Sequence, residues 1–340
     1  MKSDVWPFKE EVAKHRHANR YKPSRSFYIP VRAKFALSTS VAGLWFLFSL
    51  WMAQPWLSDL SAIIDAPAAV LVILFIALIP GFLNAHIICS VFLDAPPSLR
   101  TDVALPPVSL LVAAYNEELS IVGTLRALSR QDYPSPVEII VVDDASTDAT
   151  PKIALDAGAK VVPINRRQIA ASRNAGARAA QGEYLFFVDA DTRINRAHVS
   201  GGLVALENGY AGGGARVVMD GFVPFWGRLL LRGFSSVYFG LNLGAGAFLF
   251  TTRHNFDVIG GFDEQYFAGE EVYFSLELKK LGGFKVLREP VVTSARKLRM
   301  YSAKDFLPKF FGVIFRGPRG VRSREKLSLW YDGKRERYPA

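Results

Sequence analysis

Two long stretches without a formal charge constrain this chain more than any other feature. The first runs from Ala36 to Ser58 and the second from Ala66 to Leu93, where His86 is the only titratable group. Each is long enough to cross a hydrocarbon core of roughly 30 Å as a helix. We therefore predict a two-helix transmembrane hairpin over 35–93, rather than a cleaved signal peptide or a pair of core helices. Pro80 should kink the second helix.

The distribution of charge predicts which way the hairpin faces. Residues 1–34 carry nine Lys or Arg against three Asp or Glu, whereas the link between the two stretches holds Asp59 and Asp65 and no basic residue. Because short basic flanks stay in the cytoplasm, we expect a multi-pass protein of the plasma (inner) membrane. The N-terminal segment and everything after the hairpin would then be cytoplasmic.

The basic ends also bear on the partners of the chain. The whole chain carries +10; residues 1–34 contribute +6 and residues 285–340 contribute +10, which leaves −6 for 35–284. An acidic middle argues against nucleic acid as a partner, and basic ends suit membrane lipids instead. The single cysteine, Cys89, excludes an intrachain disulfide and a cysteine-based zinc site.

After a proline-rich linker at 94–107, apolar runs alternate with stretches of helical character. The runs lie at 108–116, 137–146, 159–164 and 183–191, and the helical stretches at 117–130, 149–157 and 169–182. Near-continuous apolar strands that alternate with helices are typical of a parallel sheet covered on both faces. We therefore predict an α/β fold with a Rossmann-like, mostly parallel sheet.

Polar side chains follow three of the predicted strands, at the ends where ligands bind in such sheets. They are Asn116-Glu117, Asp143-Asp144 and Asp189-Asp191. Asp189 and Asp191 point the same way if the strand continues through them. Two close carboxylates repel unless a cation lies between them, so this pair predicts Mg²⁺ or Mn²⁺, with a polar turn as the alternative. No GxxxxGK[ST] motif is present, which excludes the usual phosphate loop.

Four segments together resemble the family 2 glycosyltransferases of GT-A fold. They are VSLLVAAYNEE (108–118), VEIIVVDDASTDAT (137–150), SRNAGARAAQGEYLFFVDADT (172–192) and GGFDEQYFAGEEVYFSLELKKLG (260–282). The resemblance covers about half of the chain. It implies a GT-A fold and an enzyme that takes a sugar from a nucleotide-diphosphate sugar, expected to be a UDP-sugar, and inverts the anomeric carbon.

The resemblance also implies roles for individual residues. Those that would bind the donor are Ala114, Tyr115, Glu117, Asp144, Arg173, Asn174 and Asp189. Asp191, with Asp189, would hold the metal. Glu271 matches the general base, although the family usually has Asp at that position and Glu270 stands beside it as the alternative. An acidic first turn that suits the helix dipole would also explain both glutamates.

The remaining features concern the acceptor and the outline of the chain. The Gln-x-x-Arg-Trp motif of processive synthases is absent, which predicts one sugar per encounter. An aromatic and basic helix over 305–320 predicts contact with the membrane surface, with packing on the sheet as the alternative. We therefore expect a lipid-linked or glycan acceptor. The predicted order is a basic segment (1–34), hairpin (35–93), linker (94–107), GT-A domain (108–300) and amphipathic tail (301–340).

Two other functions are compatible with parts of the pattern. A nucleotidyltransferase of the same fold would use a similar metal site, but it should carry a Gly-rich loop after the first strand, where this chain has AAYNEELS. A non-catalytic membrane adaptor would keep the fold without turnover, and the intact acids at both predicted sites argue against it.

Overall fold

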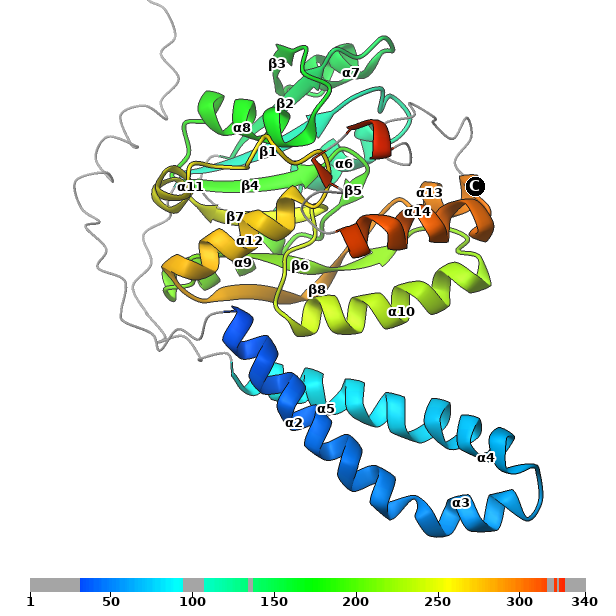
Figure 1. The fold of residues 1–340 in the computed structure, drawn as a ribbon. Coiled ribbons are helices and arrows are strands. Elements are labelled where there is room, and N and C mark those ends of the chain that lie inside the picture. The colour runs from blue at the N-terminus through cyan, green and yellow to red at the C-terminus, as the bar shows by residue number, and fades with distance from the viewer. Residues whose placement is uncertain (1–30, 94–106, 134–136, 317–320, 323, 328–340) are drawn as a thin grey trace, which may run out of the picture. The chain divides into compact units, whose positions relative to one another are not determined.

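The structure, a computed structural model, describes residues 31–93, 107–133, 137–316, 321–322 and 324–327. They divide into two compact units (Figure 1). One contains the apolar N-terminal helices together with residues 231–242, and the other contains the sheet. Most of the predicted basic segment at 1–34, nearly all of the linker at 94–107 and the end of the tail at 301–340 lie outside the described residues.

The first unit is a helical hairpin. Its elements are α2 (Val31–Met52), α3 (Gln54–Ser61), α4 (Ala66–Ile73), the π-helical turn η1 (Leu74–Leu78) and α5 (Ile79–Phe92). α2 and α5 pack against each other, with the rings of Phe35 and His86 5.3 Å apart. Two described segments, Ala33–Met52 and Ala66–Ser90, are long and apolar enough to cross a membrane. They coincide with the two uncharged stretches of the sequence.

The predicted irregularity at Pro80 takes the form of a widened helical turn. Proline donates no backbone hydrogen bond, and its ring clashes with the carbonyl four residues earlier. The π-helical turn Leu74–Leu78 lies directly before Pro80, and α5 continues through it. Such a turn absorbs the missing hydrogen bond without ending the helix. At the start of the second apolar segment, Ala66–Ser90, the Asp65 carboxylate accepts the Ala68 N–H at 2.8 Å and caps α4.

The second unit is a sheet covered by helices. Its strands are β1 (Val108–Ala114), β2 (Val137–Asp144), β3 (Lys160–Ile164), β4 (Tyr184–Asp189), β5 (Thr192–Arg193), β6 (Gly212–Met219), β7 (Phe248–Thr252) and β8 (Phe284–Thr293). Its helices are α6 (Ile121–Leu128), α7 (Thr150–Asp156), α8 (Ile169–Ala179), α9 (His198–Glu207), α10 (Phe225–Gly240), α11 (Arg253–Ile259), α12 (Glu270–Leu281), α13 (Arg296–Met300), α14 (Ala303–Arg316) and the 3₁₀ turn η2 (Arg324–Leu327). Part of α10, residues 231–240, belongs to the first unit.

The strand order is β3-β2-β1-β4-β7-β6-β8-β5, and its two halves differ (Figure 1). The first four strands are parallel and are joined by α6, α7 and α8, as the sequence predicts. In the second half, β7 is antiparallel to β4 and to β6, and β5 is antiparallel to β8, while β6 and β8 are parallel. The fold is therefore the expected GT-A type, with a more mixed sheet than the four predicted strands alone suggest.

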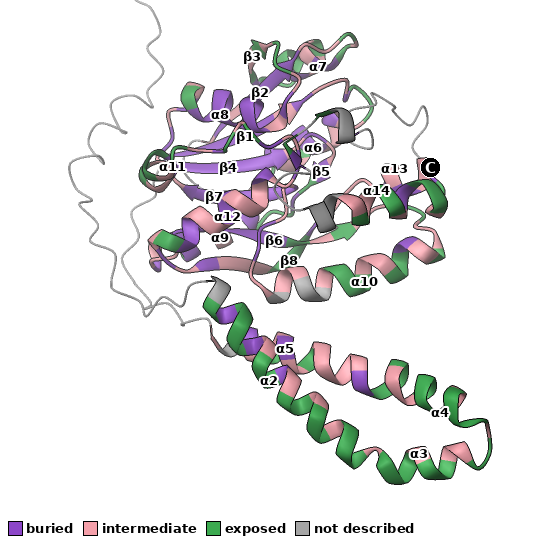
Figure 2. Ribbon diagram, viewed as in Figure 1, coloured by how far each residue is buried: buried purple, intermediate pink, exposed green. Residues whose placement is uncertain are grey.

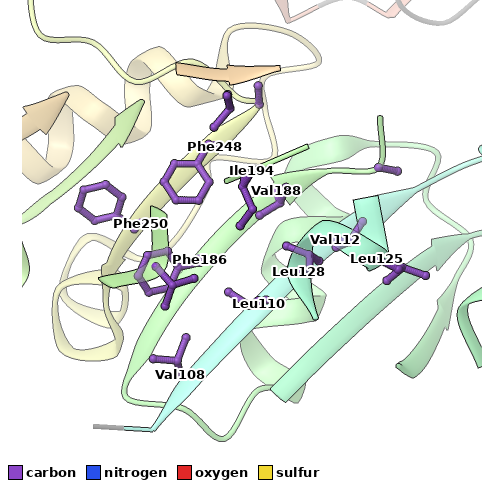
Figure 3. Close-up of a cluster of buried hydrophobic side chains, with 14 of the residues drawn as sticks. Val108, Leu110, Val112, Leu125, Leu128, Phe186, Val188, Ile194, Phe248 and Phe250 are labelled. Carbon is purple, nitrogen blue, oxygen red and sulfur yellow. The ribbon is translucent and has the colours of Figure 1, made fainter. Parts of the chain in front are cut away.

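Alternate residues of the central strands face two separate cores. Leu110 of β1 and Phe186 of β4 belong to the core covered by α6 and α9 (Figure 3). Their neighbours Leu111 and Phe187 belong to the core covered by α8, α11 and α12. Burial on both faces, visible along β1 and β4 in Figure 2, explains why these segments read as continuous apolar runs.

Helix α14 packs on the sheet unit through part of its aromatic surface. Phe306 is buried, and its ring lies 5.5 Å from Trp226 and 5.7 Å from Phe310. Phe311, in contrast, is 40% exposed. Among the described aromatic side chains of α14, Phe306 is therefore packed inside and Phe311 faces solvent, so the packing alternative applies to Phe306.

Candidate active site

The carboxyl ends of β1, β2 and β4 lie side by side at one edge of the sheet. In the register of the strands, Ala114 lies opposite Asp143 and Ala113 lies opposite Asp189. Ala114 is buried, so it exposes little surface of its own at these strand ends. The three groups of polar residues that the sequence placed at strand ends therefore meet in space.

The loops after β1 and β2 are held together by hydrogen bonds. The Asn116 N–H donates to Ser146 Oγ at 2.9 Å, and the Glu117 N–H donates to Thr150 Oγ1 at 2.8 Å. Asn116 adopts a left-handed conformation with φ 51°, which asparagine tolerates better than most residues. These contacts fix the backbone that presents the Glu117 side chain.

Asp189, the first acid of the predicted pair, is bound to a buried arginine. Arg173 is 3% exposed; its Nη2 donates to Asp189 Oδ1 at 2.9 Å and to the Gly246 carbonyl at 2.9 Å, and its Nη1 donates to Glu270 Oε1 at 2.7 Å. Burial raises the pKa of Asp189, and the Arg173 guanidinium opposes this. One guanidinium therefore joins α8, the end of β4, the loop before β7 and the start of α12.

Asp191, the second acid, is bound to a different arginine. Arg296 Nη2 lies 3.2 Å from Asp191 Oδ2, and Thr293 Oγ1 donates to Asp191 Oδ1 at 3.2 Å. The same guanidinium makes a two-point contact with Glu117, at 2.5 and 2.6 Å. Burial raises the pKa of Asp191 to about 6, although Arg296 opposes the shift. Arg296 was not among the site residues expected from the sequence.

Asp144 anchors the segment that leads into α8. Its Oδ1 accepts the N–H groups of Arg166 and Arg167 at 2.7 and 2.8 Å, and its Oδ2 accepts the Gln168 N–H at 2.8 Å and the Ser172 hydroxyl at 3.0 Å. Asp144 is buried. Both carboxylate oxygens therefore already have partners within the chain, so a direct contact with a base would have to share or replace them.

Asn174 and Tyr115 are the remaining residues expected at the donor. Asn174 exchanges two hydrogen bonds of 2.9 Å with the backbone of Phe262 and donates to Glu264 at 3.0 Å, so it holds the loop before α12. The Arg167 guanidinium lies 3.3 Å from the centre of the Tyr115 ring. Arg167 therefore stacks on Tyr115 next to these strand ends, and Asn174 holds the loop before α12 in place.

The two glutamates at the start of α12 have different environments. Glu270 is buried in the ion pair with Arg173, whereas Glu271 is partly exposed. Removal from water and the neighbouring Glu270 carboxylate raise the pKa of Glu271 to about 8, with Arg173 opposing. A carboxyl group of this kind can take up a proton near neutral pH. The two alternatives therefore differ in their surroundings: Glu270 is paired with Arg173, and Glu271 is the more exposed of the two.

The chemistry of the donor set fits a hard divalent cation. Five carboxyl groups and two guanidinium groups gather at this edge: Glu117, Asp189, Asp191, Glu270 and Glu271, with Arg173 and Arg296. The excess of acid suits a divalent cation, and Mg²⁺ commonly uses one or two carboxylates and leaves positions for phosphate oxygens. Within the described residues, no three His, Cys, Asp or Glu side chains are already arranged as a metal-binding set. Asp189 and Asp191 would hold the cation, provided that Arg296 releases Asp191.

Known proteins resemble this chain over the same region. A family profile described as Glycosyl transferase family 2 matches residues 109–259. The putative glycosyltransferase EpsH of Bacillus subtilis is 43% identical over 94 residues, which are 26% of this chain and 27% of that protein. The poly(ribitol-phosphate) beta-N-acetylglucosaminyltransferase TarS of Staphylococcus aureus is 36% identical over 95 residues, 26% of this chain and 17% of that protein. The chain thus matches about a quarter or less of the length of these two relatives.

A solved structure extends the likeness to the fold. The mannosyltransferase PcManGT from Pyrobaculum calidifontis, in complex with GDP-Man and Mn²⁺, superposes with a TM-score of 0.51 at 21% identity. The match covers 73% of this chain and 77% of that one. The sheet edge described above lies within the matched family region, except for α12 and the segments after it. Residues 109–259 are therefore similar to a glycosyl transferase family 2 domain, on a fold of the GT-A type.

Proposed function

We propose that the protein is an inverting, metal-dependent glycosyltransferase. It moves one sugar from a nucleotide-diphosphate sugar, with UDP as the expected nucleotide, to a lipid-linked or glycan acceptor at the cytoplasmic face of a membrane. The catalytic domain occupies 108–300, and the hairpin over 35–93 anchors it. The matched family and the mannosyltransferase of the same fold, which binds GDP-Man and Mn²⁺, support a nucleotide-sugar donor and a divalent cation.

One observation carries the proposal. The buried guanidinium of Arg173 links Asp189, at the end of β4, to α12, the helix that carries Glu271. Arg173 contacts Asp189 at 2.9 Å and Glu270 at 2.7 Å, and Glu271 follows Glu270 in the chain. A donor held at Asp189 and Asp191 would therefore lie near a carboxyl group with a raised pKa. Inversion needs a single base on the acceptor side and no covalent intermediate, which this arrangement provides.

In the proposed reaction, separate residues would bind the metal, line the nucleoside pocket and remove the acceptor proton. Asp189 and Asp191 hold the divalent cation, which when bound neutralises the leaving diphosphate. Tyr115 and the backbone at Ala114 form the wall of the nucleoside pocket, and Asp144 keeps the opposite loop in place. Glu271 removes the proton from the acceptor hydroxyl as that oxygen attacks the anomeric carbon. Because Arg173 fixes the helix of Glu271 to the donor edge, base and donor keep a constant separation.

The membrane placement is supported by the two apolar segments, called arms here (Ala33–Met52 and Ala66–Ser90), and by the charges around them. Lys and Arg are concentrated before the first arm, and the link between the arms contains Asp59 and Asp65. The positive-inside rule then puts the sheet domain in the cytoplasm. The arms have the length and composition for spanning, at 20 and 25 residues.

Exposed apolar side chains on the sheet unit support contact with the lipid surface. Phe222, Phe225 and Leu229 are 66%, 74% and 66% exposed, and Arg228 lies 5.9 Å from the ring of Phe225. Phe311 of α14 is also exposed, and α14 packs on the start of α10 through Phe306 and Trp226. Aromatic and basic groups in one region are typical of surfaces that bind at the bilayer interface. A lipid-linked acceptor would be presented at such a surface.

A donor screen tests the proposed activity. Purified membranes containing the protein are incubated with individual nucleotide-diphosphate sugars and Mg²⁺ or Mn²⁺, and the release of free nucleoside diphosphate is measured. We expect release from at least one donor, its loss on chelation of the metal, and its loss in Asp191→Asn. The matched control is Asp156→Asn, an exposed acid at the end of α7, which should keep full turnover.

Other outcomes would identify a different function. Release of pyrophosphate from a nucleoside triphosphate and a sugar phosphate would indicate the nucleotidyltransferase. Binding of UDP with Mn²⁺ and no release from any donor would indicate the non-catalytic adaptor. Unchanged turnover in Asp191→Asn would show that the metal ligand has been assigned to the wrong residue.

A further inference from the structure

Arg296 lies at the carboxyl ends of β1, β2 and β4, here called the donor edge, and the family resemblance assigns it no role. It pairs with both oxygens of Glu117 at 2.5 and 2.6 Å and with Asp191 Oδ2 at 3.2 Å. The side chains of all three residues are largely buried, at 16%, 7% and 15% exposure. A two-point contact between guanidinium and carboxylate is a strong, directional interaction. The contact with Asp191 is longer and single, so it is the weaker of the two.

The backbone beneath Arg296 is held independently of its side chain. The carbonyl of Thr293, the last residue of β8, accepts the Asp220 N–H at 2.8 Å, and the Ala295 N–H donates to Asp220 Oδ1 at 3.0 Å. The start of α13 is therefore fixed to the sheet edge by contacts that do not involve the guanidinium. The side chain of Arg296 can change partners while its backbone stays in place.

Arg296 and a divalent cation compete for the same carboxylate. The oxygen Asp191 Oδ2 that faces Arg296 belongs to the acid expected to bind the metal, and two cations at one carboxylate repel each other. A metal entering alone would displace the Arg296 guanidinium from Asp191, and the guanidinium would gain no other anion in exchange. A metal entering with a diphosphate would bring that anion, because phosphate oxygens accept from arginine as carboxylates do.

We propose that Arg296 is the internal counter-ion of the empty donor site and that it transfers from Asp191 to the donor diphosphate when the metal and the nucleotide bind. The inference rests on the proposed function and deepens it. Arg296 makes metal binding and nucleotide binding cooperative, because each ligand satisfies a group that the other displaces. The free enzyme then binds a divalent cation poorly, and the cation enters with the nucleotide.

The test measures binding of Mn²⁺ rather than turnover. Free Mn²⁺ is followed by electron paramagnetic resonance during titration of the full-length protein in detergent, without nucleotide and with saturating UDP or GDP. In the wild-type protein we expect one of the nucleotides to tighten Mn²⁺ binding by on the order of tenfold or more. In Arg296→Gln we expect Mn²⁺ alone to bind roughly tenfold more tightly than to wild type, and the effect of nucleotide to shrink.

Arg299→Gln is the matched control. Arg299 lies on the same short helix, and its Nη1 lies 3.5 Å from Asp220 Oδ1 and donates to the Asp220 carbonyl at 3.1 Å. The substitution removes the same charge without touching Glu117 or Asp191, so Mn²⁺ binding should stay at the wild-type value. Arg296→Lys keeps the positive charge but loses the planar guanidinium that makes two-point contacts. Its Mn²⁺ affinity should lie between those of wild type and Arg296→Gln.

The outcomes separate this inference from the proposed function. If wild type releases nucleoside diphosphate from a donor but Arg296→Gln binds Mn²⁺ no more tightly than wild type, the counter-ion role is wrong and the activity stands. If Arg296→Gln does not fold, Arg296→Lys and the wild-type titration decide, and equal Mn²⁺ affinity with and without nucleotide overturns the inference. If no form binds Mn²⁺ with either nucleotide and no donor turns over, both proposals fail.

Discussion

The ionisation of Glu271 should control how sugar transfer depends on pH. Burial and the Glu270 carboxylate raise its pKa to about 8. A general base acts only when unprotonated, and a raised carboxyl pKa keeps it protonated to higher pH, so activity falls as the pH falls. With that pKa, about a tenth of the molecules are competent at pH 7 and about a hundredth at pH 6. We therefore expect kcat/KM to rise about tenfold per pH unit up to pH 8 and then to level off.

Replacing the base should remove both the rate and its pH dependence. Glu271→Gln keeps the size of the side chain but cannot accept the proton, and the loss of a general base typically lowers the rate by about 10² to 10⁴. The reduced rate should no longer change near pH 8. Glu277→Gln is the matched control, because Glu277 lies on the same helix, is partly exposed and pairs with Lys280. It should keep the wild-type rate and profile.

The assay is release of nucleoside diphosphate from the donor identified in the screen, with saturating Mg²⁺ at constant ionic strength over about pH 5.5 to 9.5. A midpoint near 6 would instead point to Asp191, whose pKa is raised to about that value. A wild-type profile without an ionisation near 8, or a Glu271→Gln profile that keeps one, would refute the assignment of the base.

Three other predictions concern stability and topology. Asp144→Ala leaves buried donors without their acceptor and should lower the free energy of unfolding by about 3 kcal/mol, read as a fall in Tm; a loss below about 1 kcal/mol would contradict the anchoring role. Gly213→Ala should also lower Tm, because a Cβ there would lie 2.2 Å from the Lys285 carbonyl, whereas Gly123→Ala, with its nearest contact at 3.7 Å, should be neutral or stabilising. In a variant in which Cys89 is replaced, an impermeant maleimide added to intact cells should label Ala62→Cys but not Ser129→Cys. The reverse result would invert the predicted orientation.

The parallel half of the sheet was predictable because its strands are buried on both faces. Such strands appear in the sequence as uninterrupted apolar runs, and each predicted run overlaps β1, β2, β3 or β4 with ends that differ by at most two residues. The mixed half gives no comparable signal. β6 begins with Gly212, Gly213 and Gly214, because β7 and β8 approach it too closely for side chains, and glycine does not indicate a strand. β8 contains Lys, Arg, Glu and Pro and is only partly buried.

The acids of the site were predictable, and their arginine partners were less so. Strand ends are visible in the sequence, so Asp189, Asp191 and Glu117 could be expected at one edge. Arg296 follows β8, which runs in the same direction as β4, so its position depends on the strand directions in the mixed half. Had those directions been known, the rule that placed Asp189 at the site would have placed Arg296 there too. The role of Asp144 as an anchor depends on backbone donors that no sequence pattern indicates.

The single guanidinium of Arg173 also bears on how enzymes with this architecture can diversify. It ties the end of β4 to the start of α12, so in the proposed enzyme the donor site and the helix that carries the base would have to change together. This guanidinium contacts Asp189, Gly246 and Glu270, and none of them lies in the segments proposed to meet the lipid surface, at the start of α10 and along α14. If the proposed function holds, natural variation or protein engineering can exchange these segments to change the acceptor while leaving the reaction unaltered.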